Sequence, residues 1–387
     1  MADILDYLKW RGDLSLAVSP FNEVDNLILA ELSFVDFGGI VPPPGEGAAV
    51  PLRDAAARYF SAHPKEHIDM GILVPGRIPD LLEEMARSVR FRDVGLNCFA
   101  DRLDPEEGIQ FAALTAELPD GTLYLSFRGT DDTIAGWRED FEMSFLDQVP
   151  AQREAAAYVE AAARQYRRKR LRLGGHSKGG NLAVYSGVHC PAAVQRRILA
   201  VYNNDGPGFR ASLLNRPEHI RLAGRITTIV PESSVVGMLM EHEEDYTVVK
   251  SSQLGLLQHD GFSWEVLGTG FVHLAADSPA IRRNDKTLKE WVDGMDAAQR
   301  RRFTEALFDV LTCTDAETLQ DLAADSFKTA TAMLKAMADL DRETRRALTR
   351  VVGLLFKTQV LAITDDIRED LAENLKKTGR RKKGQDG

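Results

Sequence analysis

Ser177 lies in a segment whose residue types and spacing could support nucleophilic catalysis. The stretch Gly175-His176-Ser177-Lys178-Gly179 has the G-x-S-x-G spacing of a nucleophile elbow. In such an elbow the serine occupies a strained turn between a strand and a helix, so that its hydroxyl stands clear of the sheet. The residues two before and two after it come so close together that glycine is favoured at both. Both are glycine here, and the spacing therefore predicts a nucleophile at Ser177.

The elements around Ser177 follow one another in the order that an elbow needs. Residues 151–170 are rich in alanine, contain no Gly or Pro and end in a basic cluster, which predicts a helix. Leu171 to Leu173 predict a short strand, and Asn181 to His189 predict a second helix that stops before Pro191. The alternative is a glycine-rich phosphate-binding loop, but neither of the usual phosphate motifs is present. The order of elements favours the elbow.

The elements further along the chain predict an α/β fold. Gly108–Leu118 and Thr122–Phe127 flank Pro119-Asp120-Gly121, a strong turn signal, and predict a hairpin. Helical patterns alternate with further apolar runs, which predict strands. The predicted helices are Asn22–Phe37, Ile78–Val89 and Asp132–Phe145, and the predicted strands are Arg197–Tyr202, Arg225–Val230, Tyr246–Lys250 and Phe262–Leu267. This alternation predicts a mostly parallel sheet with helices on both faces.

Two blocks of this chain together resemble the class 3 (fungal-type) lipases. The first is the run from Tyr124 to Asp140, in which a strand ends in Phe-Arg-Gly-Thr and a Trp and an Asp follow, and the second is the elbow. The chain also resembles an uncharacterised bacterial family of lipase-like α/β-hydrolases, through Asn203–Phe209 (NNDGPGF) and Gln258–Trp264 (QHDGFSW). The resemblance covers roughly Cys98 to Val272 and implies an α/β-hydrolase-type sheet. Where the lipases have an apolar or amide residue after the serine, this chain has lysine.

The resemblance implies an oxyanion hole with two backbone donors. One is the N–H of Lys178, which opens the elbow helix, where amides are free and the helix dipole is positive. The other is Thr130, at the end of the Phe-Arg-Gly-Thr block. Thr130 has an alternative role as N-cap of the helix that begins near Asp132. We expect Arg128 and Asp140 to form an ion pair that ties this loop together.

A serine hydroxyl needs a base within hydrogen-bond reach, and the hydrolase order is Ser, then acid, then His. His259 follows the predicted strand Tyr246–Lys250 in a loop, where the last catalytic residue of this fold lies, so we predict His259 as the base. His273 is the alternative, although a histidine among apolar residues is more often a core group. Four other histidines are disfavoured by position: His176, His189, His219 and His242.

Two carboxylates compete for the role of catalytic acid. Asp205 comes shortly after the predicted strand Arg197–Tyr202, and Glu232 comes shortly after Arg225–Val230. The Asn-Asp-Gly-Pro sequence around Asp205 is also ordinary turn chemistry, and Glu232 could cap a helix that starts near Ser233. The shorter side chain and the resemblance favour Asp205, with Glu232 as the alternative.

The composition of the whole chain narrows the classes of protein it can belong to. The chain has 387 residues and a formal net charge of -10, which disfavours a nucleic-acid binder. The N-terminus does not resemble a secretory signal, and no apolar run reaches the ~20 residues that span a bilayer. The three cysteines, Cys98, Cys190 and Cys313, are scattered, so we expect reduced thiols in a cytoplasmic protein. No motif indicates a metal or another cofactor.

Four regions are expected along the chain. Residues 1–90 predict a helical N-terminal extension that packs on the core, residues 91–277 the α/β-hydrolase core, and residues 278–375 an α-helical C-terminal region. Residues 376–387 form a basic tail, which is expected to be disordered. A weak contact of this tail with an anionic membrane surface is the alternative.

These residues lead to a primary hypothesis and two alternatives. The primary hypothesis is a serine hydrolase that cleaves a carboxylic ester of a small molecule or a lipid, through an acyl-enzyme on Ser177. An acyltransferase or thioesterase would use the same residues, because only the acceptor or the leaving group differs. The third hypothesis is a catalytically silent hydrolase fold that serves as a binding module, with the helical C-terminal region as its interface.

Overall fold

The computed structural model describes residues 1–71, 74–104, 106–131, 133–232, 234, 246–274 and 296–312, with the single positions 318 and 345. The chain divides into two compact units, Met1–Thr304 and Glu305–Gly387. Helix α12 (Ala297–Leu311) is the described helix of the predicted C-terminal region. Apart from Asp296, Thr312, Thr318 and Arg345, the rest of that region and the basic tail, residues 376–387, lie outside the described residues, so the four predicted regions remain predictions.

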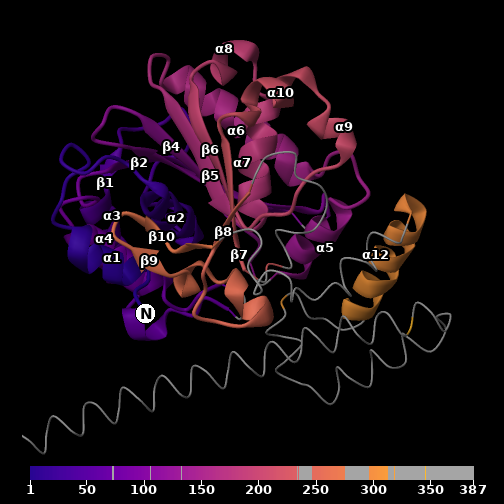
Figure 1. Cartoon of the computed structure of the whole chain (residues 1–387), viewed down its shortest axis with the longest axis horizontal. Helices are drawn as coiled ribbons and strands as arrows, with labels where there is room; N and C mark the ends of the chain where they lie inside the picture. Colours follow the sequence, from indigo (N-terminus) through magenta and orange to yellow (C-terminus); the bar gives the residue numbers. More distant parts are fainter. Residues whose placement is uncertain are drawn as a thin grey trace, which may run out of the picture. The chain divides into compact units, whose positions relative to one another are not determined.

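A mixed nine-stranded sheet organises the described part of the first unit, in the order β1-β2-β3-β4-β5-β6-β7-β8-β11 (Figure 1). Strands β4 to β8 are parallel and follow one another in chain order, while β1, β2, β3 and β11 pair antiparallel. The predicted hairpin is formed by β3 and β4. The strands are β1 (Val50–Pro51), β2 (Gly95–Asp104), β3 (Ile109–Glu117), β4 (Leu123–Phe127), β5 (Leu171–His176), β6 (Ile198–Asn204), β7 (Ile226–Pro231), β8 (Tyr246–Val249) and β11 (His273–Leu274).

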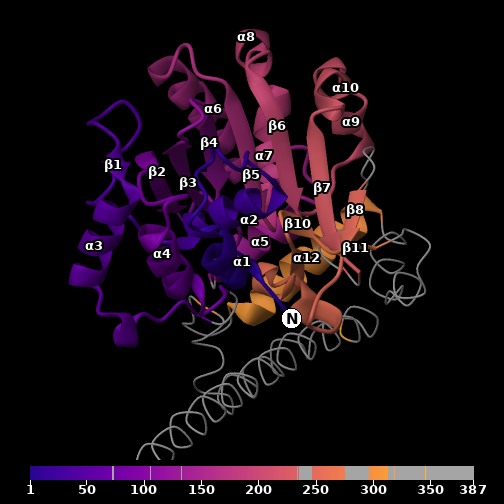
Figure 2. The ribbon, with the colours of Figure 1, turned by 60° about the vertical axis from the view of Figure 1, so that its left-hand side comes forward.

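One face of the sheet is covered by the helices that connect the parallel strands. Because these strands succeed one another in chain order, right-handed crossovers place the connecting helices on the same face. Leu123, Leu125 and Phe127 of β4 point to this side and pack in one apolar cluster with α6 and α7. The helices are α5 (Ile134–Glu142), α6 (Pro150–Gln165), α7 (Lys178–His189), α8 (Ala192–Gln195), α9 (Ala211–Leu214) and α10 (Pro217–Ala223). Figure 2 shows β5, β6 and β7 side by side.

The other face is covered by the N-terminal helices, which Figure 1 shows to the left of β5, β6 and β7, with α6 and α7 to the right. Helix α2 packs against β4 and β5. Between the apolar residues of β4, Tyr124 and Ser126 point to this side, and their hydroxyls donate to the carbonyls of Asn26, at 3.1 Å, and Leu29, at 2.7 Å. The helices are α1 (Ile4–Arg11), α2 (Glu23–Glu31), α3 (Leu52–Ala62) and α4 (Ile78–Arg87). Helices therefore flank both faces, and the α/β-hydrolase-type fold is confirmed.

The prediction of a strand over Phe262–Leu267 is wrong for its first half. The chain forms a short 3-10 helix at Gly261–Ser263, and the strand is β9 (Val266–Leu267), paired with β10 (Gly270–Phe271) in a separate two-stranded sheet. The Asp260 carboxylate accepts from the Phe262 N–H at 2.9 Å and caps the 3-10 helix. This local turn chemistry outweighs the strand preference of the aromatic residues.

Two further expectations concern the chain as a whole. Cys98 and Cys190 are buried free thiols, and Cys313 lies outside the described residues. Among the helices that the structure describes, none has the length and apolar character needed to cross a bilayer.

Candidate active site

Ser177 occupies the turn between β5 and α7. Its backbone has φ 57° and ψ -131°, a left-handed conformation that a residue other than glycine rarely adopts. The Ser177 N–H donates to the carbonyl of Asn204 on β6 at 2.9 Å, and the Ser177 carbonyl accepts from the Gly180 N–H at 2.9 Å. These two bonds hold the strained turn. The strand, turn and helix expected around the elbow are therefore present.

The glycines of the motif are required by close backbone approach. A Cβ atom on Gly175 would overlap the backbone of Gly179 and come within 2.5 Å of the Phe127 carbonyl oxygen. A Cβ atom on Gly179 would overlap the same carbonyl. The elbow therefore packs directly on the end of β4, which brings the loop after β4 to the serine.

His259 and Asp205 form a hydrogen-bonded pair. Asp205 directly follows β6, is fully buried and has a positive φ of 51°. His259 ends a 3-10 helix (Gly255–His259) in the loop after β8, and its Nδ1 lies 2.6 Å from Asp205 Oδ2. The second carboxylate oxygen accepts from the Ser234 hydroxyl. Because the carboxylate accepts the Nδ1 proton, the neutral imidazole has its lone pair on Nε2, as a general base requires.

The serine and this pair gather at the carboxyl ends of neighbouring strands. Ser177 bonds to Asn204, the residue before Asp205, and His176 Nε2 donates to the His259 carbonyl at 2.7 Å. The His259 side chain is 28% exposed. Within the described residues no hydrogen bond joins Ser177 Oγ to the His259 ring, a contact that in hydrolases often tightens when substrate binds.

The competing residues lie elsewhere. Glu232 follows β7, its backbone N–H donates to the Val249 carbonyl at 3.1 Å, and in the described ranges its carboxylate has no bond to a histidine. His273 lies in β11, half-exposed, with its Nε2 2.9 Å from Glu23 Oε1. His219 is buried in α10, His189 stacks on Tyr185 within α7, and His242 lies outside the described residues.

The two residues expected to form the oxyanion hole flank the serine. Lys178 is the first residue of α7, and a Cβ built on Gly129 would lie 3.2 Å from Ser177 Cβ, so the Phe-Arg-Gly-Thr loop lies against the elbow. Thr130 follows in this loop, and its hydroxyl donates to Asp140 Oδ2 at 2.5 Å. Neither the Lys178 N–H nor the Thr130 N–H has an acceptor among the described residues. Both amides can therefore donate to a ligand.

Two expectations about this loop are wrong. The N-cap of α5 is Thr133, whose hydroxyl accepts from the backbone N–H of Gly136. Thr130 therefore does not cap this helix. Arg128 does not pair with Asp140. It binds Asp101 on β2, at 3.0 and 3.1 Å, and Asp131, at 3.4 Å. The Asp140 carboxylate accepts from the Thr130 hydroxyl instead.

Lys178 has a second feature that the motif analysis missed. Its side chain is fully buried, and its Nζ donates to Glu139 Oε2 at 2.9 Å and to the Gln110 carbonyl at 3.0 Å. The other oxygen of Glu139 accepts from the Ala151 N–H at 2.7 Å. The sequence did contain a signal for this ion pair, since Lys178 stands where the lipases have an apolar or amide residue. A buried ammonium needs a buried carboxylate beside it.

Helix α5 thereby holds both candidate donors, since Glu139 binds Lys178 and the next residue, Asp140, binds Thr130. Burial raises the pKa of Asp140 to about 6, although the Lys178 charge and the Thr130 bond oppose the shift. The Oδ1 atom of Asp140 is buried and has no hydrogen-bond partner in this part of the structure.

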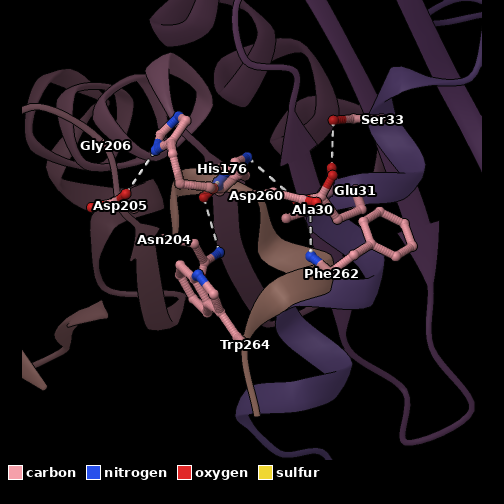
Figure 3. A network of polar contacts seen from close by, with 12 residues as sticks. Ala30, Glu31, Ser33, His176, Asn204, Asp205, Gly206, Asp260, Phe262 and Trp264 are labelled. Atoms are coloured by element: carbon pink, nitrogen blue, oxygen red, sulfur yellow. Dashed lines mark hydrogen bonds and ion pairs between the residues drawn. The ribbon is translucent and has the colours of Figure 1, made fainter. Parts of the chain in front are cut away.

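A second polar cluster lies beside the His259 loop, and we call it the buried cluster: Glu31, His176 and Asp260. In Figure 3 Asp205 lies to the left of this network and Glu31 to the right, with His176 and Asp260 between them. His176 Nδ1 lies 3.3 Å from Glu31 Oε1, and both side chains are buried. Burial lowers the pKa of His176 well below its ordinary value and raises that of Glu31 well above. Over the described ranges, no group of three or more His, Cys, Asp or Glu residues could hold a metal ion.

Comparison with known proteins gives one family match and several distant structural similarities. A family model described as Mbeg1-like matches residues 85–309. No curated protein matches the chain. The Rhizomucor miehei lipase propeptide complex is 18% identical over 42% of this chain, with a TM-score of 0.32, and the match spans 58% of that chain. A mutant of MDLA from Penicillium cyclopium is 11% identical over 65% of this chain and 84% of that chain, with a TM-score of 0.38. The Lip2 lipase of Yarrowia lipolytica is 12% identical over 43% and 69%, with a TM-score of 0.31.

Proposed function

The chain belongs to the Mbeg1-like family, a lipase-like family of α/β-hydrolases, and we propose that it hydrolyses carboxylic esters through an acyl-enzyme on Ser177. The observation that supports this most is the hydrogen bond of 2.6 Å between His259 Nδ1 and Asp205 Oδ2, directly beside the strained Ser177 turn. A histidine with its Nδ1 proton held by a buried carboxylate and its Nε2 free has the form of a general base.

In the first half of the reaction Ser177 Oγ attacks the carbonyl carbon of the ester. His259 Nε2 takes the hydroxyl proton, and Asp205 stabilises the imidazolium that forms. The negative charge that develops on the carbonyl oxygen is stabilised by the backbone N–H groups of Lys178 and Thr130 and by the positive end of α7. The C–O bond of the ester then breaks, and the alcohol leaves with the proton from His259.

In the second half a water molecule gives a proton to His259 Nε2 and attacks the acyl carbon. The bond to Ser177 Oγ breaks, and His259 returns the proton to the serine, which releases the carboxylic acid. The site residues supply every proton transfer, so the proposed reaction needs no metal or other cofactor. We propose an apolar acyl ester, of a small molecule or a lipid, as the substrate class.

Acyl transfer and thioester hydrolysis stay as alternatives, because the acyl-enzyme is common to all three reactions. The three reactions differ only in the acyl acceptor or in the leaving group, and the same Ser177, His259 and Asp205 would serve each of them. A silent hydrolase fold is the alternative from another class. The strained turn at Ser177 argues against it, because a protein without a nucleophile gains nothing from a turn that costs about 1–3 kcal/mol.

Labelling of the full-length chain with a fluorophosphonate tests the proposal without knowledge of the substrate. We expect a single adduct, located at Ser177 by peptide mass spectrometry, and turnover of short p-nitrophenyl esters. Ser177→Ala should lose both. Ser186→Ala is a matched control on the same helix, because the Ser186 hydroxyl is buried and donates to the Ala183 carbonyl at 3.1 Å. Ester turnover by the Ser177→Ala protein at the wild-type rate would end the serine-hydrolase proposal.

A further inference from the structure

His176 holds the backbone of the residue that we propose as the base. It is the last residue of β5, directly before Ser177, and is 4% exposed. Its Nε2 lies 2.7 Å from the His259 carbonyl oxygen. A carbonyl can only accept, so Nε2 carries a hydrogen and donates. The two imidazole rings lie 4.6 Å apart between centroids, at an angle of 32°. A shift of His176 would therefore move His259.

The other nitrogen of His176 faces a buried carboxyl group. His176 Nδ1 lies 3.3 Å from Glu31 Oε1, and Glu31, the last residue of α2, is fully buried. Neither oxygen of Glu31 has a hydrogen-bond partner in the described part of the chain. A buried carboxylate without a donor is costly, so a proton is needed between this oxygen and Nδ1.

The charges around this contact favour a neutral pair. Burial holds the pKa of His176 well below its ordinary value, and burial and then the nearby Asp260 carboxylate raise that of Glu31. The Arg77 charge opposes the rise in the pKa of Asp260. A neutral His176 with its hydrogen on Nε2 has a bare lone pair on Nδ1, and a protonated Glu31 would donate to it.

A neutral His176 also suits the proposed reaction. His259 must become an imidazolium while the tetrahedral intermediate forms. A second imidazolium with its ring 4.6 Å away would disfavour this charge and weaken the base. A neutral ring supplies the hydrogen bond to the His259 backbone without that repulsion.

We propose that His176 and Glu31 are positioning residues for His259: the neutral Glu31 carboxyl donates to His176 Nδ1, and His176 Nε2–H holds the His259 backbone so that its ring stays against Asp205. We call this pair the neutral brace. The inference rests on the proposed function in so far as His259 is the base.

Four variants of the full-length chain test the neutral brace. His176→Leu removes the donor to the His259 carbonyl and should lower kcat by about 10²-fold, the cost of a misplaced catalytic group, with little change in KM. His176→Gln supplies an amide N–H near the Nε2 position and should recover at least about tenfold of this loss. Glu31→Leu should lower kcat similarly, and Glu31→Gln should recover most of the loss, because an amide donates to Nδ1 as a protonated carboxyl does.

A second glutamate and histidine of this chain provide a matched control. Glu23 lies on the same helix as Glu31, and its Oε1 is 2.9 Å from His273 Nε2. This pair is partly exposed and does not contact His259. His273→Leu and Glu23→Gln should leave kcat and its pH profile as in the wild type.

A proton NMR signal tests the positioning role directly. It distinguishes a misplaced His259 from an unfolded protein, and it does not depend on the proposed ester hydrolysis. The proton between His259 Nδ1 and Asp205 should give a downfield proton resonance in the wild type. It should broaden or shift in His176→Leu and return in His176→Gln. If the Leu variant does not fold, His176→Asn replaces it, because the shorter amide cannot reach the carbonyl.

Three outcomes are decisive. Wild-type kcat and an unchanged resonance in His176→Leu would overturn the positioning role. Equal losses in Glu31→Gln and Glu31→Leu would show that the pair needs a charged carboxylate, and would overturn the neutral brace. If the wild type is not labelled at Ser177, the proposed function fails, and the resonance in the His176 variants still decides whether the brace holds His259.

Discussion

Two polar clusters meet at the carboxyl end of β5, and each contains a histidine beside a carboxyl group. In the open cluster, His259 is 28% exposed and its Nδ1 lies 2.6 Å from buried Asp205. In the buried cluster, His176 is 4% exposed and its Nδ1 lies 3.3 Å from Glu31. The rings of the two histidines are 4.6 Å apart. Two side chains of the same type, almost in contact, therefore have different chemistry available to them.

The difference between the clusters shows that a carboxyl partner alone does not make a histidine a base. The His259 side chain is 28% exposed and its Nε2 has no hydrogen-bond partner among the described residues, whereas both nitrogens of His176 face protein groups. Burial lowers the pKa of His176 well below its ordinary value, so that it stays neutral and acts as a fixed donor. This difference is the basis for our proposals that the open cluster moves a proton and that the buried cluster positions the His259 backbone.

The largest expected loss of kcat is that of His259→Ala, in the open cluster. His259→Ala should lower kcat about as much as Ser177→Ala, by ~10⁴-fold or more, since nucleophile and base act as one unit. The double variant should be little slower than either single variant in p-nitrophenyl ester assays. Near-wild-type activity in His259→Ala, together with loss of activity in His273→Ala, would move the base to the other histidine.

The second prediction tests the carboxylate of the open cluster. Asp205→Asn should lower kcat by about 10³–10⁴-fold, because the amide no longer selects the required tautomer or stabilises the imidazolium. The melting temperature should change little, and Glu232→Gln should slow the reaction much less. If Asp205→Asn mainly lowers the melting temperature and leaves kcat unchanged, Asp205 is a turn residue.

The third prediction concerns the buried ion pair of Lys178 and Glu139, beside Ser177. Lys178→Met keeps the backbone N–H but leaves Glu139 buried without its cation, so we expect the free energy of unfolding to fall by about 3–5 kcal/mol. Urea unfolding measures this loss. The double variant with Glu139→Gln should recover part of it, since no buried charge then remains. Equal stability of wild type and Lys178→Met would mean that the ion pair contributes nothing.

The smallest expected effect concerns Asp260 of the buried cluster. Burial raises the pKa of Asp260 from 3.8 to about 6. The folded chain therefore holds a proton that the unfolded chain has lost between about pH 4 and 6, and the free energy of unfolding falls as the pH rises through this window. Asp260→Asn keeps the cap on the Phe262 N–H and should remove this fall, about 1–2 kcal/mol for a partly buried group. Parallel pH profiles of wild-type and variant stability would contradict the shift.

Local sequence was sufficient where short-range sterics decide the structure. The turn at Ser177 is predicted by five residues, because the close approach of Gly175 and Gly179 is a property of the turn itself. The hairpin of β3 and β4 and helix α6 also follow from nearby residues, through a turn signal and a helical composition. These features depend on atoms a few residues apart, so sequence reasoning reaches them.

Contacts between distant segments could be decided only by the tertiary structure. Asp205 and His259 are 54 residues apart, and the sequence left Glu232 as an alternative to Asp205 until the order of β6, β7 and β8 set their positions. The Lys178–Glu139 pair likewise joins two helices, and Glu31 reaches His176 from an N-terminal helix. Nothing in the residues beside Glu31 indicates a partner so far along the chain.

The sequence by itself therefore determined the elbow at Ser177, the hairpin of β3 and β4, the strands that become β5 to β8, and His259 as the predicted base. The tertiary structure decided which carboxyl group meets which histidine and which histidine stays open to solvent. The physical reason is the separation along the chain over which each effect acts. Backbone sterics and turn chemistry act between residues that are only a few positions apart. Burial, charge pairing and hydrogen bonding depend on which segments the sheet brings together.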